Sequence, residues 1–169
     1  MDVRAAHVLT LFMLGCGAPS VTYEAGVVRT PSGVAFRVGE PPQGWQRVKV
    51  DDAAIAFHDE NGSSVMVSGR CNLKADDVPL VALTNQLVAG TTDRQYETEE
   101  ILPFDRREAR HTILRAKLDG VPLVWDVYVM KKNGCVYDMA YVAPPEHFEK
   151  GKLAFERFVS DFHTVGDPQ

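Results

Sequence analysis

Three segments of alternating polarity, joined by two tight turns, constrain the fold of this sequence more than any other feature. The segments are 109–118, 121–129 and 135–143, and in each of them apolar side chains recur at every second position. Asp119-Gly120 separates the first two, and Asn133-Gly134 separates the last two. Asp-Gly or Asn-Gly between alternating runs is the strongest short-range signal for a β-hairpin. The second half of the chain is therefore predicted to form a three-stranded antiparallel meander.

Shorter extended segments precede the meander. Pro41-Pro42 separates the first two of them, and Asn61-Gly62 between the last two predicts a further hairpin. The segments predicted to be strands are 33–38, 45–50, 53–58 and 63–71.

Two stretches have helical periodicity. The first begins at Asp76-Asp77, carries Pro79 in its first turn and ends at Gly90, as helix termini prefer. Its apolar residues at helical spacing are Leu80, Val81, Leu83, Leu87 and Val88. The second covers about 145–163 and has an apolar stripe that we expect to pack on the sheet, made of Phe148, Phe155, Phe158, Val159 and Phe162. The order strands, helix, strands, helix predicts an α+β domain, an antiparallel β-sheet covered by two main helices.

The N-terminus has the parts of a secretory signal. Arg4 supplies a thin positive region, 5–14 is apolar, and Gly15 is a small residue of the kind that precedes a cleavage site. The end of this stretch, Met13-Leu14-Gly15-Cys16, resembles the bacterial lipobox, although Met13 and Leu14 depart from the usual aliphatic and small residues. The resemblance implies that Cys16 is acylated and becomes the mature N-terminus. Two or three acyl chains hold a protein stably at a bilayer, whereas one chain does not.

The following stretch supports an anchor. Residues 17–33 are small, polar and rich in turn formers, as in a flexible tether. We therefore expect a signal peptide at 1–15, a lipidated cysteine and flexible tether at 16–32, and one domain at 33–165. Gly17, rather than aspartate, follows the cysteine, which favours the outer membrane in the bacterial sorting pattern. The alternative is a short buried or interfacial helix with an incidental cysteine.

Charge excludes one class of partner. The 169-residue chain has a net charge of -5, and its basic runs are only pairs, Arg106-Arg107 and Lys131-Lys132. Nucleic-acid binding needs clustered lysine and arginine, so it is not expected here. No stretch of 18 apolar residues follows the N-terminal segment, so no further membrane span is predicted.

The order of elements and the closing sequence GCVYDMAYVAPPEHFEKGKLAFERFVSDFHTV resemble the PsbP-like family. These domains are related to the extrinsic lumenal subunit of the photosystem II oxygen-evolving complex, and share their fold with a Ran-binding nuclear-import protein and the periplasmic lipoprotein DcrB. The features that carry the resemblance, over roughly 33–165, are the strand 135–143, the Ala143-Pro144 break, Phe155-Glu156, Ser160-Asp161-Phe162, and the early strand 33–38 followed by proline and Trp45. The resemblance implies a binding or assembly module rather than an enzyme. Photosynthetic members are associated with the retention of manganese, calcium and chloride, but no metal-binding residue of theirs matches a position in this chain.

Cys71 and Cys135 are the clearest candidate pair of side chains. Both lie in predicted strands with faces that point to a core, and an oxidising compartment favours their pairing. A disulfide closing a loop of this length would stabilise the fold by about 4 kcal/mol on the chain-entropy model. The alternative is two buried thiols that act as small apolar side chains.

Other polar clusters have no specific spacing. His58-Asp59-Glu60, His111, His147 and His163 lack the spacing of a metal site, and are expected to be a polar hairpin end and scattered surface histidines. No metal or cofactor is predicted. Glu97, Glu99 and Glu100 are expected on the solvated face of an edge strand. Arg106, Arg107 and Arg110 are expected to form either an anion patch or a solvated loop. Trp125 is expected in the core, and Trp45 either in the core or on a binding surface. No serine lies in a G-x-S-x-G pattern.

These features predict a membrane-anchored extracytoplasmic lipoprotein that binds or helps to assemble an envelope partner without catalysis. The membrane is one expected partner, through acyl chains on Cys16, and an envelope protein of unknown identity is the other. A small-ligand or metal-ion binding protein is the alternative, and a hydrolase whose site the sequence hides is the third.

Overall fold

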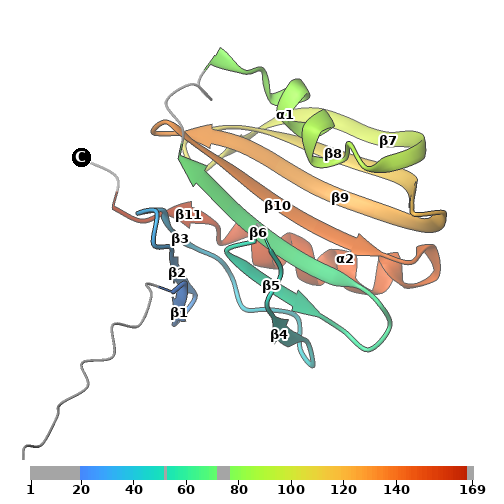
Figure 1. The fold of residues 1–169 in the computed structure, drawn as a ribbon, viewed down its shortest axis with the longest axis horizontal. Coiled ribbons are helices and arrows are strands. Elements are labelled where there is room, and N and C mark those ends of the chain that lie inside the picture. The colour runs from blue at the N-terminus through green and yellow to red at the C-terminus, as the bar shows by residue number, and fades with distance from the viewer. Residues whose placement is uncertain (1–19, 52, 72–76, 167–169) are drawn as a thin grey trace, which may run out of the picture.

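The computed structural model describes residues 20–51, 53–71 and 77–166. Its main element is an antiparallel sheet of seven strands (Figure 1). In spatial order the strands are β4 (Gln46–Val48), β5 (Ile55–His58), β6 (Ser64–Cys71), β10 (Cys135–Ala143), β9 (Val121–Lys132), β8 (Arg107–Leu118) and β7 (Thr91–Phe104). The predicted meander is confirmed as β8, β9 and β10, paired in sequence order.

Tight turns fix the register of the meander. Asp119-Gly120 and Asn133-Gly134 both have two consecutive residues with positive φ, the conformation that type I′ hairpin turns require. The predicted hairpin at Asn61-Gly62 is also present, and the Asp59 carboxylate accepts hydrogen bonds from the backbone N–H groups of Asn61 (2.9 Å) and Ser63 (2.8 Å). A further hairpin joins β7 to β8 through Asp105-Arg106, which has positive φ at both residues without a glycine.

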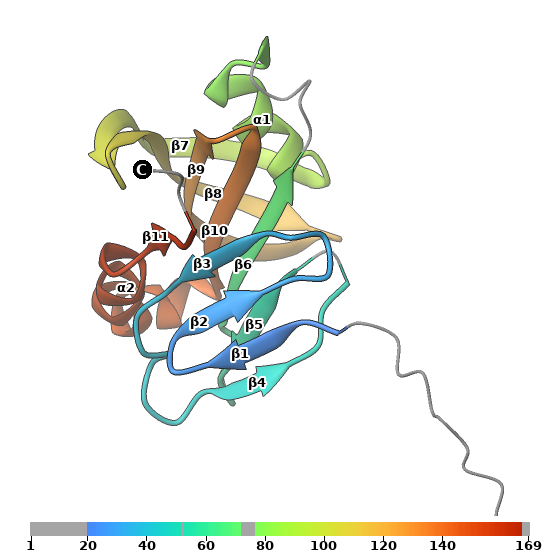
Figure 2. The same ribbon diagram turned by 90° about the vertical axis from the view of Figure 1, so that its left-hand side faces the viewer.

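A second sheet departs from the sequence prediction. It contains β1 (Thr22–Glu24), β2 (Val27–Arg29), β3 (Ala35–Arg37) and β11 (His163–Thr164), in that order, and Figure 2 shows it lying across the end of the larger sheet. The expectation of a flexible tether throughout 16–32 is therefore wrong for β1 and β2. The two strands are too short to give a periodic signal in the sequence. They form a hairpin, β2 pairs with β3, and Val28 is completely buried.

The two helices lie on opposite faces of the large sheet. The helix α1 (Leu80–Leu87) packs Leu83 against Val129, and α2 (Pro145–Ser160) packs Phe155 against Tyr128. Tyr128 and Val129 are consecutive residues of β9, and successive residues of a strand point to opposite faces of the sheet. The two helices that they contact therefore lie on opposite faces. The prediction that two helices cover the sheet is therefore incomplete. The second sheet also covers part of the face on which α2 lies.

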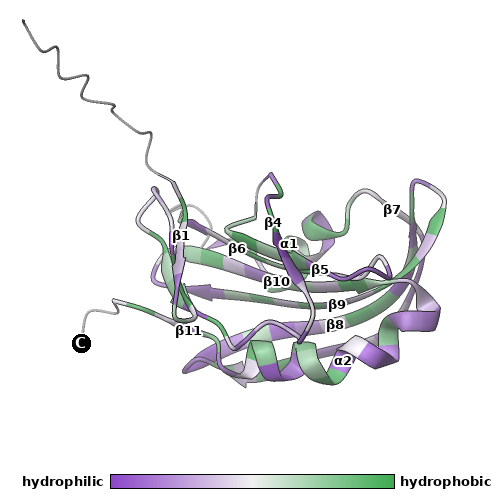
Figure 3. Cartoon of the chain, turned by 90° about the horizontal axis from the view of Figure 1, so that it is seen from below, coloured by the Kyte–Doolittle hydropathy of each residue, from purple (hydrophilic) through white to green (hydrophobic). Residues whose placement is uncertain are grey.

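The aromatic stripe of α2 forms the main core, as predicted. Figure 3 shows apolar and polar bands alternating along this helix. Phe162 lies beyond the helix, which ends at Ser160 rather than at 163, but it is buried with the rest. The core joins three layers, with residues from the second sheet (Val28, Phe36), the large sheet (Val65, Met139, Tyr141) and α2 (Phe148, Phe155, Phe158).

In the described part of the chain, no helix is long and apolar enough to span a membrane.

Candidate functional site

The largest cleft lies where the second sheet meets the end of α2 and the loop before β4. Its volume is about 990 Å³. The loop 39–45 contributes backbone as well as side chains. Three aromatic side chains line the cleft, namely Tyr23, Trp45 and Phe162, together with the polar or charged side chains of Arg37, Glu40, Asp161 and His163.

Backbone contacts hold the walls of this cleft. The N–H of Gly39 donates to the carbonyl oxygen of Phe158 at 3.0 Å, which attaches the loop directly to α2. A Cβ atom on Gly39 would lie 2.9 Å from the Phe158 Cα atom, so the close approach requires glycine. On the opposite wall, the Arg37 guanidinium donates to the carbonyl of Ala25 at 2.8 Å. The cleft is therefore built into the fold rather than left between loose loops.

Two of the aromatic side chains of the cleft, Tyr23 and Trp45, are half-buried and fixed by packing. The ring of Trp45 lies 6.2 Å from that of Tyr141, and the ring of Tyr23 meets Phe57 edge-on at 5.9 Å. The Arg47 guanidinium stands 5.5 Å from the centre of the Tyr23 ring. Burial raises the pKa of Tyr23, and nearby Arg47 opposes the rise in part. Trp45 therefore contacts the core, which is one of its two predicted positions, and it also lines the cleft.

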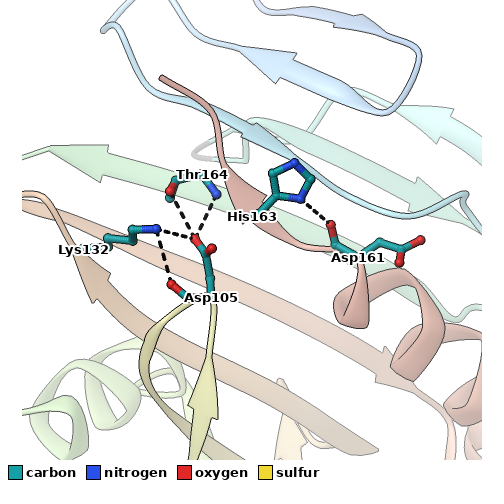
Figure 4. A network of polar contacts seen from close by, with 5 residues as sticks. All are labelled: Asp105, Lys132, Asp161, His163 and Thr164. Carbon is teal, nitrogen blue, oxygen red and sulfur yellow. Dashed lines mark hydrogen bonds and ion pairs between the residues drawn. The ribbon is translucent and has the colours of Figure 1, made fainter. Parts of the chain in front are cut away.

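A buried ion pair contacts β11 next to His163, one of the residues that line the cleft (Figure 4). One carboxylate oxygen of Asp105 accepts hydrogen bonds from Lys132 Nζ (3.0 Å), from the Thr164 N–H (2.9 Å) and from the Thr164 hydroxyl (3.1 Å). The side chains of Asp105 and Lys132 are only 6% and 5% exposed. This network ties the β7–β8 turn and β9 of the large sheet to β11 of the small one. It therefore positions His163, which precedes Thr164, at the cleft.

The most perturbed polar cluster lies elsewhere, on the α2 face of the large sheet. His111 of β8 places Nε2 2.8 Å from the fully buried Asp126 and Nδ1 2.9 Å from Glu100. Its ring stacks on Tyr128 at 4.3 Å. Burial alone would lower the pKa of His111, but its hydrogen bonds to the two carboxylates outweigh burial and raise the pKa. The expectation of surface histidines is therefore wrong for His111, because β8 turns this residue toward the core side of the sheet.

The His111 imidazole is held on both sides within the cluster. Both imidazole nitrogens are occupied by carboxylates, so neither is available as a general base without rearrangement. Burial and the neighbouring Asp126 carboxylate raise the pKa of Tyr128, so its phenol stays neutral. These residues join β7, β8 and β9, and we assign them a structural role.

Asp138 is the second notable buried carboxylate. It is 4% exposed, pairs with Arg70 at 2.7 Å and accepts a hydrogen bond from the Ser68 hydroxyl at 3.1 Å. Burial raises its pKa, and Arg70 and Ser68 act against that rise. A serine beside a carboxylate lacks the intervening base that activates a hydroxyl nucleophile. This arrangement gives no support to a hydrolase.

The cysteines that were singled out fall in two regions. Cys71 and Cys135 are directly opposite each other on β6 and β10, and their sulfur atoms are bonded at 2.03 Å. Cys16, the predicted signal peptide and the first part of the predicted tether lie outside the described residues.

The remaining predicted polar residues are mostly dispersed. The acidic residues of β7 lie on an edge strand, as expected, and they pair across to β8 as Glu97 with Arg115, Glu99 with Arg110, and Glu100 with His111. Arg107 and Arg110 are three positions apart on β8 and therefore point to opposite faces, so they do not form one patch with Arg106. Among the described residues, no group of three or more His, Cys, Asp or Glu side chains is arranged to hold a metal ion.

Sequence reasoning missed most of the cleft. Only Trp45 beside Pro41-Pro42 was noted as a surface candidate, whereas Tyr23 and Arg37 come from segments whose position depends on the second sheet. Two glycines and two prolines in the loop 39–45 were the available signal, since functional residues are often carried on loops that a rigid scaffold positions.

Comparison with known proteins identifies the fold. No protein-family model and no curated protein sequence matches this chain. Among solved structures, cyanobacterial PsbP (CyanoP) from Synechocystis is similar with a TM-score of 0.53 and 16% identity, over 89% of this chain and 96% of that one. PA94 from Pseudomonas aeruginosa, described as a protein of unknown function and putative regulator, gives 0.51 and 8%, over 90% and 99%. LpqN, described as involved in cell envelope biogenesis of Mycobacterium tuberculosis, gives 0.55 and 10%, over 82% and 88%. The chain therefore has the PsbP-like α+β fold that the sequence resemblance implied.

Proposed function

We propose that this protein is a lipid-anchored extracytoplasmic module that binds an envelope partner and has no catalytic activity of its own. The observation that carries the binding role is the cleft of about 990 Å³ at the junction of the two sheets. It combines fixed aromatic rings with charged groups of both signs, a lining typical of recognition sites. Its walls are held by backbone hydrogen bonds, so a partner would meet a preformed surface.

The sequence supports the anchor and the compartment. Cys16 ends the lipobox-like segment, and Cys71 pairs with Cys135, as an oxidising compartment allows. The envelope role described for the structural neighbour LpqN agrees with this placement. The outer membrane remains the favoured location, because glycine follows Cys16.

The chemistry of the buried polar groups favours binding over catalysis. His111, Asp126, Asp138, Lys132 and Asp105 are buried titratable side chains of the described region. Each of them makes hydrogen bonds or ion pairs within the fold. Their perturbation is therefore explained by structure, and a reactive centre is not needed to account for it.

Site-specific photo-crosslinking in intact cells tests the binding role. A photoreactive residue at Gln43, exposed on the cleft loop, should give a discrete adduct with an envelope component. The same residue at Leu153, 57% exposed on the outer side of α2, should not. The substitution Glu40→Lys at the cleft should weaken the Gln43 adduct severalfold, and the matched Glu149→Lys on α2 should leave it unchanged.

Two results would count against this role. Equal adducts at positions 43 and 153 would mean that contact with the envelope is unspecific. A small molecule or metal ion that copurifies with the protein and is lost in Glu40→Lys would favour the ligand-carrier alternative.

A further inference from the structure

We propose that a second, apolar cleft beside the start of β1 rests on the bilayer surface to which the protein is anchored. This inference depends on the proposed acylation of Cys16. The cleft has a volume of about 670 Å³. Most of its lining is apolar, from Val21, Pro31, Val48, Val50, Ala54 and Ile55.

The length of the tether places this cleft close to the membrane. Because β1 already begins at Thr22, the segment between anchor and fold is much shorter than the 16–32 expected from composition. Ser20 lines the cleft itself, and only residues 17–19 separate it from Cys16. An extended chain spans at most about 3.5 Å per residue, so Ser20 lies within about 14 Å of the acylated residue in any conformation.

The surface chemistry of the cleft suits a bilayer. Val50 is 39% exposed, although an isolated valine at the surface would prefer to be covered. Arg47 and Lys49 are exposed at the cleft and flank Val48, and their long stems can lie along apolar surface while the charges reach lipid headgroups. Asp51 follows closely, so the apolar lining rather than net charge is the feature that a bilayer would contact.

A bilayer fits this surface better than a protein partner does. An anchored bilayer within about 14 Å leaves little room for a folded protein, whose diameter is about 30 Å even for a small domain. Figure 2 places the start of the described chain and α2 on opposite sides of the molecule. Docking through the apolar cleft therefore leaves α2 directed away from the membrane.

Lysine footprinting on membranes tests the orientation. Full-length acylated protein is bound to vesicles of phosphatidylethanolamine with a minority of phosphatidylglycerol, and is labelled with an impermeant amine reagent. Mass spectrometry then compares Lys49 at the cleft with Lys150, which is exposed on α2. We expect labelling of Lys49 to fall severalfold relative to the Cys16→Ser protein mixed with the same vesicles. Labelling of Lys150 should not change.

A second pair of variants separates docking from anchoring. Val50→Asp should restore the labelling of Lys49 while the protein stays with the vesicles. Val121→Asp, at a position 56% exposed in the β8–β9 turn, should leave Lys49 protected. If vesicle-bound protein labels equally at Lys49 and Lys150, the docking inference is overturned while the anchor stands. If the wild-type protein carries no acyl group and stays free of vesicles, the proposed anchor itself is overturned.

Discussion

At the scale of single residues, the charge of His111 couples the stability of the fold to pH. It lies between Asp126, which is fully buried, and Glu100, which is exposed. The carboxylates raise its pKa above the ordinary value of 6.5 in spite of burial. A raised pKa in the folded state means that protonated His111 stabilises the fold below 6.5. That stabilisation is lost as the pH rises through the folded-state pKa.

The contribution of His111 to the stability of the wild-type protein should therefore fall as the pH rises from 6.5 through its folded-state pKa, because neutral imidazole replaces the cation. The glutamine in His111→Gln cannot titrate. The free energy of unfolding of this variant should be lower than that of the wild-type protein by roughly 2 kcal/mol at low pH, because a hydrogen bond to a charged group contributes about that much. Urea denaturation across this pH range measures both effects. His163→Gln is the control, because His163 is exposed and its Nδ1 lies next to the Asp161 carbonyl oxygen instead of a carboxylate. An unchanged pH dependence in His111→Gln would contradict this account.

The histidine cluster was not predictable from sequence. Glu100, His111 and Asp126 are 11 and 15 residues apart along the chain, and their contact depends on the pairing of β7, β8 and β9. Cys71 and Cys135 were easier to pair, because only two cysteines remain after Cys16 is assigned to the anchor.

At the scale of elements, the contact between α2 and the large sheet depends on one glycine. The Tyr141 hydroxyl, from β10, donates to the carbonyl of Phe148 at 3.1 Å in the first part of α2. A Cβ atom on Gly151 would overlap this hydroxyl and would lie 2.7 Å from the Tyr141 Cζ atom. The helix approaches the sheet closely only because residue 151 has no side chain.

Gly151→Ala should therefore destabilise the protein, by roughly 1–3 kcal/mol as overpacking usually does. In an exposed helix the same change would instead stabilise by about 1 kcal/mol. Thermal and urea unfolding measure the difference. Lys150→Ala, at the exposed neighbouring position, should be close to neutral. Adding Tyr141→Phe to Gly151→Ala should recover part of the loss, and an equal or higher stability of Gly151→Ala alone would contradict the contact.

The strands differ in how well they can be predicted from their sequences. The meander was predicted because β8, β9 and β10 alternate cleanly and are joined by Asp-Gly and Asn-Gly turns. The 14 residues of β7 were predicted only around their acidic cluster. As an edge strand, β7 is mostly exposed, and two register shifts, between Thr92 and Gln95 and between Tyr96 and Thr98, break the period of two.

At the scale of the whole molecule, the position of the second sheet determines both clefts. Its strands β1 and β2 have only three residues each, too few for a periodic signal. They are held by tertiary contacts, namely the pairing of β2 with β3 and the edge-on contact of Tyr23 in β1 with Phe57 in β5. Fold class was therefore predictable from the larger sheet and α2, whereas the proposed binding cleft and the short length of the proposed tether were not.

These two clefts give the molecule a proposed orientation. The apolar cleft lies beside Ser20, close to the anchor, and the cleft lined by Trp45 and Tyr23 is the proposed partner site. Both proposals require Cys16 to be acylated.

Intact mass and membrane fractionation of the protein expressed in a bacterial host, beside Cys16→Ser, test that requirement most directly. We expect the wild-type protein to be cleaved before Cys16, to gain the mass of its acyl groups and to sediment with membranes. The Cys16→Ser protein should gain no acyl mass and should leave the membrane fraction. A wild-type protein that retains residues 1–15, or that carries no acyl group, would contradict the account.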